Sequence, residues 1–210
     1  TLNVSVTDDQ LGQYVRRKNA IADRLGKSLS FDCVMATLQC IHDGQFETPS
    51  AKPRSVLRRI QSDLALPATK GKRLLSQQQA LFPGWVDPDF TNYGCDVVGE
   101  ARPETLVDVY EQVEDATSKQ IFEGQGVDLD KLCLTQDQIV SFVEKHRSHL
   151  HPQGHATFFL FKVSGQFFVV DVHWDDALRL KESVRRFSIG SVWSASLRFR
   201  VVLPQLSLWF

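Results

Sequence analysis

The sequence predicts an α+β protein in which N-terminal helices are followed by a C-terminal antiparallel four-strand meander. The main observation is a series of short apolar runs between residues 156 and 203, each bounded by turn residues. The last two runs alternate apolar and polar side chains, which is typical of a half-buried antiparallel sheet. The second observation is the amphipathic pattern of the N-terminal segment, which is typical of helices.

Helix patterns dominate the start of the chain. Thr7–Gln10 is a capping box that predicts the start of a helix with an apolar stripe, and Gly26 is a suitable end for that helix. A second helix is expected from Ser30 to Asp43. We also expect a short helix near residues 54–60, whereas residues 104–113 fit either a strand or a helix.

Further helix signals precede the predicted sheet. Residues 115–122 have a helical pattern, and Thr135–Gln138 is another capping box. The helix that begins there carries Ile139 and Phe142 on one side, and the segment Pro152–Gly154 ends it.

The first two predicted strands form a hairpin whose register follows from its turn. Ser164 and Gly165 look like a two-residue turn, so Phe158 should pair with Asp171. Large apolar side chains occur at both odd and even positions of this hairpin, so both of its faces need cover. We expect the N-terminal helices to pack on one of these faces.

Charge is distributed unevenly along the chain. We divide it into a helical region (residues 1–66), a mixed acidic region with long loops (67–134) and a helix-plus-sheet region (135–210), with a single compact domain as the alternative. Residues 76–140 carry a formal charge of −10, and the segments before and after them are net basic. We expect these charges to neutralise one another on folding, and a basic surface for an acidic partner is the functional alternative.

Composition excludes several classes of protein. The chain has 210 residues, of which 42% are hydrophobic, and no apolar run approaches the length of about 18 that a membrane helix needs. No basic segment followed by an apolar run opens it, so we expect no secretory signal. Its four cysteines form no C-x-x-C pair, which argues against metal ribbons and redox motifs. Reduced thiols in the cytoplasm are the expectation.

Seven short segments spread over the chain point to related sequences. They are TFFLFK, QFFVV, VRRF, VW and RVVLPQL near the C-terminus, and SVTDDQL and DFTNYG further upstream. In these segments the chain resembles a group of uncharacterised hypothetical proteins from candidate-phylum bacteria. The resemblance implies a bacterial, cytoplasmic setting. It implies no activity, so no functional residue is transferred.

One set of residues has the order found in papain-like cysteine hydrolases. Cys33 lies near the start of a predicted helix, His155 opens a strand and Asp171 lies on the next strand. In such enzymes the helix N-terminus lowers the thiol pKa, the histidine takes the thiol proton, and the carboxylate orients the ring. The simple hairpin register argues against this triad, because it places His155 and Asp171 on opposite faces.

A basic group of side chains is expected on the outer face of the third and fourth strands. If both strands alternate simply, five cations point the same way. They are Arg179, Lys181, Arg185, Arg198 and Arg200. Such a face can bind phosphates, although Phe187 is the one aromatic side chain available for stacking. A solubilising outer face that protects an edge strand is the alternative.

Four histidines crowd together in the segment HRSHLHPQGH. They are His146, His149, His151 and His155. Imidazoles this dense can bind zinc or nickel, but no carboxylate or cysteine lies nearby at ligand spacing. We therefore expect neither a metal nor a cofactor.

These observations favour a non-enzymatic binding or interaction protein of the cytoplasm. No catalytic set satisfies both spacing and register, whereas a basic face and surplus apolar surface are present. The expected partner is a protein or another acidic partner, nucleic acid included, and not a membrane. The alternative is a papain-like cysteine hydrolase that uses Cys33, His155 and Asp171. The sequence gives no prediction of oligomeric state.

Overall fold

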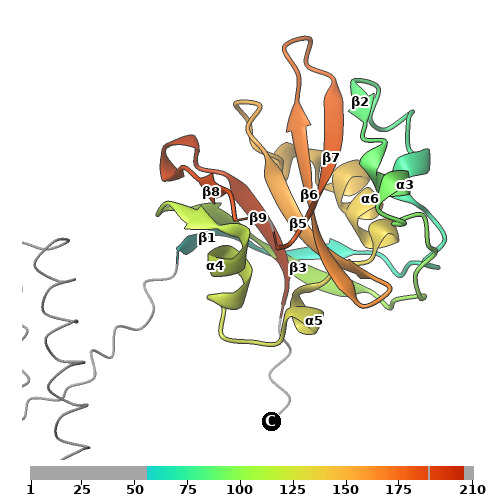
Figure 1. Ribbon diagram of the computed structural model, residues 1–210, viewed down its shortest axis with the longest axis horizontal. Helices are drawn as coiled ribbons and strands as arrows, with labels where there is room; N and C mark the ends of the chain where they lie inside the picture. The colour runs from blue at the N-terminus through green and yellow to red at the C-terminus, as the bar shows by residue number, and fades with distance from the viewer. Residues whose placement is uncertain (1–55, 189, 206–210) are drawn as a thin grey trace, which may run out of the picture. The chain divides into compact units, whose positions relative to one another are not determined.

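A seven-stranded mixed sheet forms the centre of the structure (Figure 1). This computed structural model describes residues 56–188 and 190–205, which belong to the unit Pro53–Phe210. The helices predicted to begin at Thr7 and Ser30 lie outside the described residues.

The seven strands come from most of the described chain. They are β1 (Leu57–Leu66), β2 (Trp85–Val86), β3 (Thr105–Gln112), β5 (Thr157–Val163), β6 (Gln166–Trp174), β7 (Leu180–Arg186) and β9 (Arg200–Pro204). Their order in the sheet is β1-β3-β9-β5-β6-β7-β2. Neighbours pair antiparallel except β5 with β9 and β2 with β7, which are parallel.

The remaining elements are short. A separate ribbon pairs β4 (Ala116–Thr117) with β8 (Val192–Trp193). The α-helices are α3 (Asp89–Asn92), α4 (Ser118–Glu123), α5 (Leu129–Leu132) and α6 (Gln136–Lys145). The 3-10 turns are η1 (Leu75–Gln77), η2 (Arg147–His149) and η3 (Ala195–Leu197).

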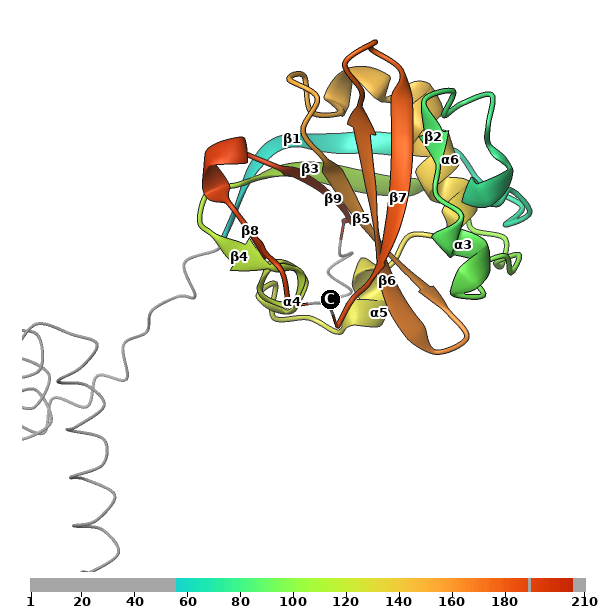
Figure 2. The same cartoon turned by 45° about the horizontal axis from the view of Figure 1, so that its top comes forward.

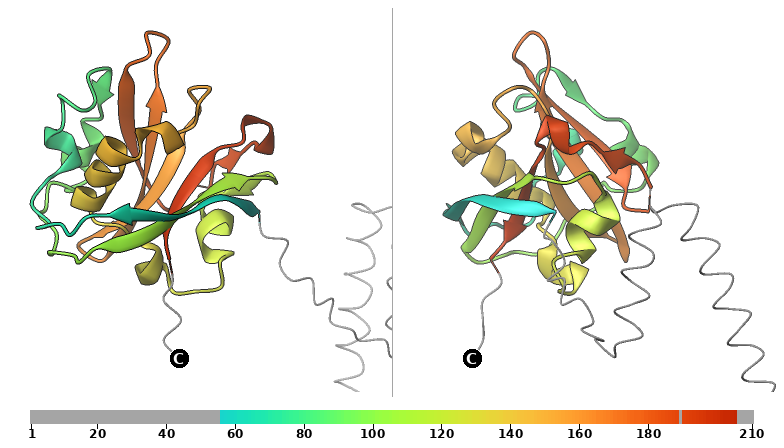
Figure 3. Two further views of the ribbon diagram at one scale, coloured as in Figure 1. Left: turned by 180° about the vertical axis from the view of Figure 1, so that it is seen from behind. Right: turned by 90° about the vertical axis from the view of Figure 1, so that its left-hand side faces the viewer.

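The two faces of the sheet are covered by different elements. Figure 3 shows α6 on one side of the sheet and α4 and α5 on the other. Figure 2 shows the β4–β8 ribbon beside α4. The sheet is strongly twisted, so β1 and β3 run at a steep angle to β6 and β7 (Figure 1).

The predicted fold class, N-terminal helices followed by an antiparallel four-strand meander, is wrong. β5, β6 and β7 are antiparallel neighbours as expected, but β9 lies between β3 and β5 rather than beside β7. The alternating run from Val192 to Leu203 is not one strand, because the Ser194 side chain caps η3. Arg198 then adopts a left-handed conformation with φ of 48°, which turns the chain into β9. Alternation alone could not distinguish this break from a continuous strand.

The short helix expected near residues 54–60 is also wrong, because β1 begins there. Bulges interrupt the pairing of β1 with β3 between Arg59 and Gln61 and between Gln61 and Leu64. These shifts disturb the two-residue period by which a strand is recognised in a sequence. The ambiguous segment 104–113 forms β3, which has β1 and β9 as its two neighbours.

Two predictions based on turn and cap chemistry, the Ser164–Gly165 turn and the capping box at Thr135, are confirmed. Ser164 and Gly165 both have positive φ angles, 49° and 79°, as a two-residue type I′ turn requires. Phe158 pairs with Asp171 in the expected register. Thr135 forms the predicted capping box at the start of α6, although this helix ends at Lys145 and not at Pro152–Gly154. Thr117 forms a second complete capping box, which was not predicted, at the start of α4.

Both faces of the β5–β6 hairpin are buried, as its sequence requires. On one face α6 packs Phe142 edge-on against Phe159, with ring centroids 5.3 Å apart. On the other face Phe158 belongs to a second apolar cluster with Phe122 of α4 and Leu132 of α5. The expected cover by N-terminal helices falls outside the described residues; within them, helices that follow β3 supply it.

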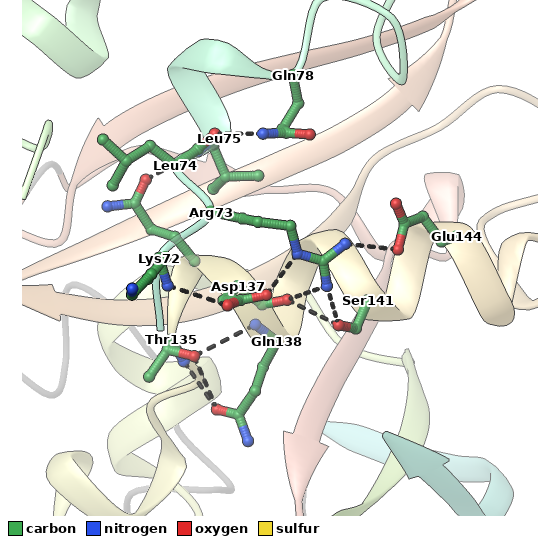
Figure 4. A network of polar contacts seen from close by, with 11 residues as sticks. Lys72, Arg73, Leu74, Leu75, Gln78, Thr135, Asp137, Gln138, Ser141 and Glu144 are labelled. Atoms are coloured by element: carbon green, nitrogen blue, oxygen red, sulfur yellow. Dashed lines mark hydrogen bonds and ion pairs between the residues drawn. The ribbon is translucent and has the colours of Figure 1, made fainter. Parts of the chain in front are cut away.

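A polar network fixes α6 to the segment that precedes η1 (Figure 4). Buried Asp137, in the first turn of α6, accepts hydrogen bonds from the Lys72 backbone (3.1 Å) and from Arg73 Nε (2.5 Å). Arg73 also donates to Ser141 Oγ and to Glu144 Oε2. One guanidinium therefore contacts three successive turns of the helix.

We expect Arg73→Ala to destabilise the protein by about 2 kcal/mol, because it leaves the buried Asp137 carboxylate without its charged partner. The matched control is Arg58→Ala, which removes an exposed arginine from its pair with Glu111 and should cost less than about 1 kcal/mol. Urea unfolding of both variants measures the difference. Equal losses in the two variants would contradict a special role for Arg73.

Candidate functional site

The structure does not place the five predicted cations on one surface. Arg200 lies on the face that α6 covers, because its cross-strand partner is Thr157 and its neighbour in alternation, Val202, belongs to that core. Its Nη1 atom donates to the carbonyls of His149 and Leu150, 2.7 Å away in both cases. Arg200 therefore holds η2 in place and is not available to a partner.

Two further cations lie apart from the rest. Arg198 is exposed at the left-handed turn before β9, and its side chain forms no ion pair among the described residues. Arg179 lies at the β6–β7 turn, where Asp175 Oδ2 accepts a hydrogen bond from its Nε (3.0 Å) and forms an ion pair with its Nη2 (2.9 Å). These contacts stabilise the turn, so Arg179 does not belong to an open binding surface.

Lys181 and Arg185 do share a surface, and Ser183 lies between them. All three alternate along β7 and point to the same face of the sheet. Across the β6–β7 pair, Lys181 lies opposite His173 and Ser183 lies opposite Asp171. We call the set Lys181, Ser183, Arg185 and His173 the β7 donor face.

Buried Asp171 organises this surface. Its Oδ1 atom lies 3.0 Å from His173 Nδ1, and its Oδ2 atom accepts a hydrogen bond of 3.2 Å from Arg185 Nε. Asp171 thus orients the His173 ring through Nδ1 and the Arg185 guanidinium through Nε. His173 Nε2 and both terminal nitrogens of Arg185 form no hydrogen bond with the described residues.

Trp193 of β8 supports the Arg185 guanidinium. The guanidinium carbon lies 5.3 Å from the indole ring centroid, within cation–π distance. The ring is fixed by Phe158 (centroids 4.8 Å apart), by Phe199 (5.4 Å) and by a hydrogen bond of 3.3 Å to Ser118 Oγ. Arg185 is therefore preorganised by a carboxylate on one side and an aromatic ring on the other.

The three residues of the predicted hydrolase are not brought together in the described part of the chain. Cys33 lies outside the described residues. The His155 ring lies 4.9 Å from the His151 ring and 6.2 Å from the Phe199 ring, and it forms no hydrogen bond with Asp171. The histidine that Asp171 orients is His173.

The histidine-rich segment serves structural roles. His151 is buried, and burial lowers its pKa to about 4, so the ring is neutral at physiological pH. Its Nδ1 accepts a hydrogen bond of 3.2 Å from the Gln153 backbone, and His146 Nε2 lies 3.0 Å from the Ala65 carbonyl. Over residues 56–188 and 190–205, no three side chains among His, Cys, Asp and Glu are grouped as metal ligands.

The two described thiols have raised pKa values, whereas a nucleophilic cysteine needs a lowered one. Burial raises the pKa of Cys95 to about 11 and that of Cys133 to about 12. Both thiols are therefore protonated at physiological pH and unreactive toward electrophiles.

Two features of this site were not predicted from the sequence. Alternation along β6 places Asp171 and His173 on one face of the strand, but their direct contact was not predicted. Trp193 was not predicted as an aromatic support either, because β8 pairs with β4 and not with β7. The first feature was visible in the spacing of two residues, whereas the second depends on a long-range pairing that the sequence does not reveal.

A buried carboxyl group lies on the opposite face of β7. Glu182 is fully buried between its cross-strand partners Val86 and Val172, and neither carboxyl oxygen has a hydrogen-bond partner among the described residues. Burial raises the pKa of Glu182 to about 9, with smaller contributions from Asp87 and Asp171. The group is therefore uncharged at pH 7, and no sequence pattern marked it.

Comparisons with known proteins give no guide to this site. No protein-family model, curated protein sequence or solved structure matches the chain. Within the described residues, no helix has both the length and the apolar character needed to cross a bilayer.

Glu182 should make the protein less stable as the pH rises from about 4.5 toward about 9. Over this range the unfolded chain releases the Glu182 proton whereas the folded chain retains it, so the free energy of unfolding falls by up to about 1.4 kcal/mol per pH unit. Glu182→Gln, which is neutral at every pH, should flatten this dependence and be more stable than the wild type at pH 8.

Urea unfolding between pH 5 and pH 8 measures the effect. The control is Glu100→Gln, which changes an exposed glutamate and should leave the slope unchanged. If the wild type and Glu182→Gln lose stability in parallel, the proton is not retained by Glu182.

Proposed function

We propose that this protein is a binding module that recognises an acidic partner through the β7 donor face. The observation that supports this proposal is the alignment of Lys181, Ser183 and Arg185 along one strand, with Arg185 held by Asp171 and Trp193. Successive members are about 7 Å apart along the strand. The surface therefore offers a row of donors to an extended, negatively charged chain.

Charges elsewhere in the part of the chain that the structure describes leave this face open. No carboxylate of the acidic segment 76–140 forms an ion pair with Lys181 or Arg185 among the described residues. Among the described residues, the one carboxylate paired with a cation of this face is Asp171, which is buried and positions Arg185. This arrangement supports a face that is open to an external acidic partner.

Salt dependence of binding tests this proposal. Lys181→Glu should weaken binding to an acidic probe and flatten the dependence of log K on log salt by roughly 0.7–0.9 for a phosphate contact. The probes are a single-stranded oligonucleotide, a duplex of the same length and polyglutamate. Fluorescence anisotropy from about 50 mM salt upward covers the range in which counterion release is measurable.

Arg198→Glu is the matched control, because it makes the same change of charge at an exposed arginine outside the β7 donor face. It should bind the probes like the wild type. Equal weakening in both variants would indicate a response to net charge alone, and absence of binding to all three probes at low salt would refute the proposal. The comparison among probes separates nucleic acid from acidic protein.

A cysteine hydrolase of the papain-like kind is a second proposal, which the bond between Asp171 and His173 favours. The pair has the arrangement of a general base and its orienting carboxylate, with His173 in place of His155. Asp171 contacts His173 Nδ1, so Nε2 is the ring nitrogen that could accept a proton. Cys33, the nucleophile in the sequence-based hypothesis, lies outside the described residues.

We expect Cys33 to react slowly with iodoacetamide at pH 6, because the thiolate and not the thiol is the nucleophile. Cys95 and Cys133 contribute no signal, since burial raises their pKa to about 11 and about 12. Cys33→Ala and Cys40→Ala identify which remaining thiol is labelled, with mass spectrometry as the readout. Rapid stoichiometric labelling that Cys33→Ala abolishes would favour the hydrolase over the binding module.

A further inference from the structure

A polar cavity of about 430 Å³ opens over β1, β3 and β9, on the side of the sheet that carries α4 and α5. Its polar wall is formed by Arg59, Asp63, Asp108, Tyr110, Gln125 and Gln205, and the apolar residues Leu132, Leu203 and Pro204 complete it. None of these residues belongs to the β7 donor face. We call this cavity the β1–β3 pocket.

Buried Asp108 is the centre of the pocket wall. Its Oδ2 accepts a hydrogen bond from Arg59 Nη1 (3.1 Å) and lies 3.4 Å from the Tyr110 hydroxyl. Its Oδ1 accepts from the Asp63 backbone (3.2 Å) and from Gln205 Nε2 (2.7 Å). Four groups from β1, β3 and the end of β9 therefore meet at one carboxylate.

The backbone of β1 is shaped to bring two of these groups to the pocket. The two bulges of β1 lie on either side of Gln61, and Asp63 has a left-handed φ of 62°. Bulges re-aim the side chains of a strand and are frequent next to binding and active sites. A non-glycine residue with positive φ is uncommon, although aspartate tolerates it better than most.

Several polar atoms of the pocket have no hydrogen-bond partner among the described residues. They are Arg59 Nε and Nη2 as donors, and the amide oxygens of Gln125 and Gln205 as acceptors. The Asp63 carboxylate adds further acceptor capacity, since its contacts are with Ser62 Oγ and Gln205 Nε2. The pocket thus presents donors and acceptors together, which suits hydroxyl groups.

The charge of the pocket excludes anionic ligands. Asp63 and Asp108 carry two negative charges, and Arg59 supplies one positive charge. The Arg59 charge already faces Asp108, so little attraction remains for an anion. Burial raises the pKa of Tyr110, so its hydroxyl remains neutral and can donate or accept a hydrogen bond.

We propose that the β1–β3 pocket binds a neutral polyhydroxylated small molecule, the chemical class to which free sugars belong. The hydroxyl groups would bond to the carboxylate and amide oxygens and to Arg59. The apolar C–H face of the ligand would pack against Leu132 and Leu203. Pockets of this volume are within the size range of small-ligand sites.

Saturation-transfer NMR on the full chain tests this inference. The probes are neutral monosaccharides and disaccharides together with myo-inositol, and glucuronate and spermidine represent anionic and cationic ligands. We expect transfer to at least one neutral probe with a Kd of about 1 mM or below. Glucuronate and spermidine should not displace the neutral probe that binds.

Substitutions of pocket residues test whether the neutral probe binds in the β1–β3 pocket. Asp63→Ala should weaken it at least about tenfold, because a charged acceptor is lost, and Tyr110→Phe should weaken it less while preserving the fold. Asp130→Ala, which removes an exposed carboxylate paired with Lys162, is the matched control and should have no effect.

Three results would overturn the inference. They are absence of transfer to every neutral probe, binding that neither Asp63→Ala nor Tyr110→Phe changes, and binding of spermidine alone. The inference is independent of the β7 donor face, because binding of a neutral ligand should not respond to Lys181→Glu or to salt.

Discussion

The β5–β6 hairpin imposes the constraint on which the rest of the structure depends. Its side chains are apolar on both faces, so a layer of structure is required on each side of the sheet. α6 provides one layer, and Arg73 and Asp137 hold that helix in place. α4, α5 and the β4–β8 ribbon provide the other layer. The short helices are explained by this need for cover and not by helical propensity alone.

The second layer also creates the two candidate sites at its margins. Trp193 both covers Phe158 and supports Arg185, so the same side chain completes the core and fixes one member of the β7 donor face. At the other margin, Leu132 of α5 meets Leu203 of β9 beside the polar wall of the β1–β3 pocket. At both places the buried apolar layer ends, and polar groups that can bind ligands lie next to it.

Local chemistry made part of the fold predictable from the sequence. The turn at Ser164 and Gly165 sets the hairpin register, and the capping box at Thr135 marks the start of α6. The failures have a common cause in long-range pairing. β1 pairs with β3 through bulges that conceal its alternation, and Arg198 diverts β9 to a distant position in the sheet. Alternation along the strand predicted that Lys181 and Arg185 share a face. The β1–β3 pocket could not be predicted in this way, because it depends on contacts between segments far apart in the chain.

The position of β9 determines how the sheet can assemble. β3 and β5 do not pair with each other, because β9 lies between them and is the last of the described strands in chain order. Before β9 docks, β1 with β3 and β5 with β6 and β7 are separate sheet fragments, and each exposes an unpaired edge. Non-local pairing of this kind slows folding, and open edges favour aggregation. A need for chaperones during synthesis would therefore follow from strand order and not from composition.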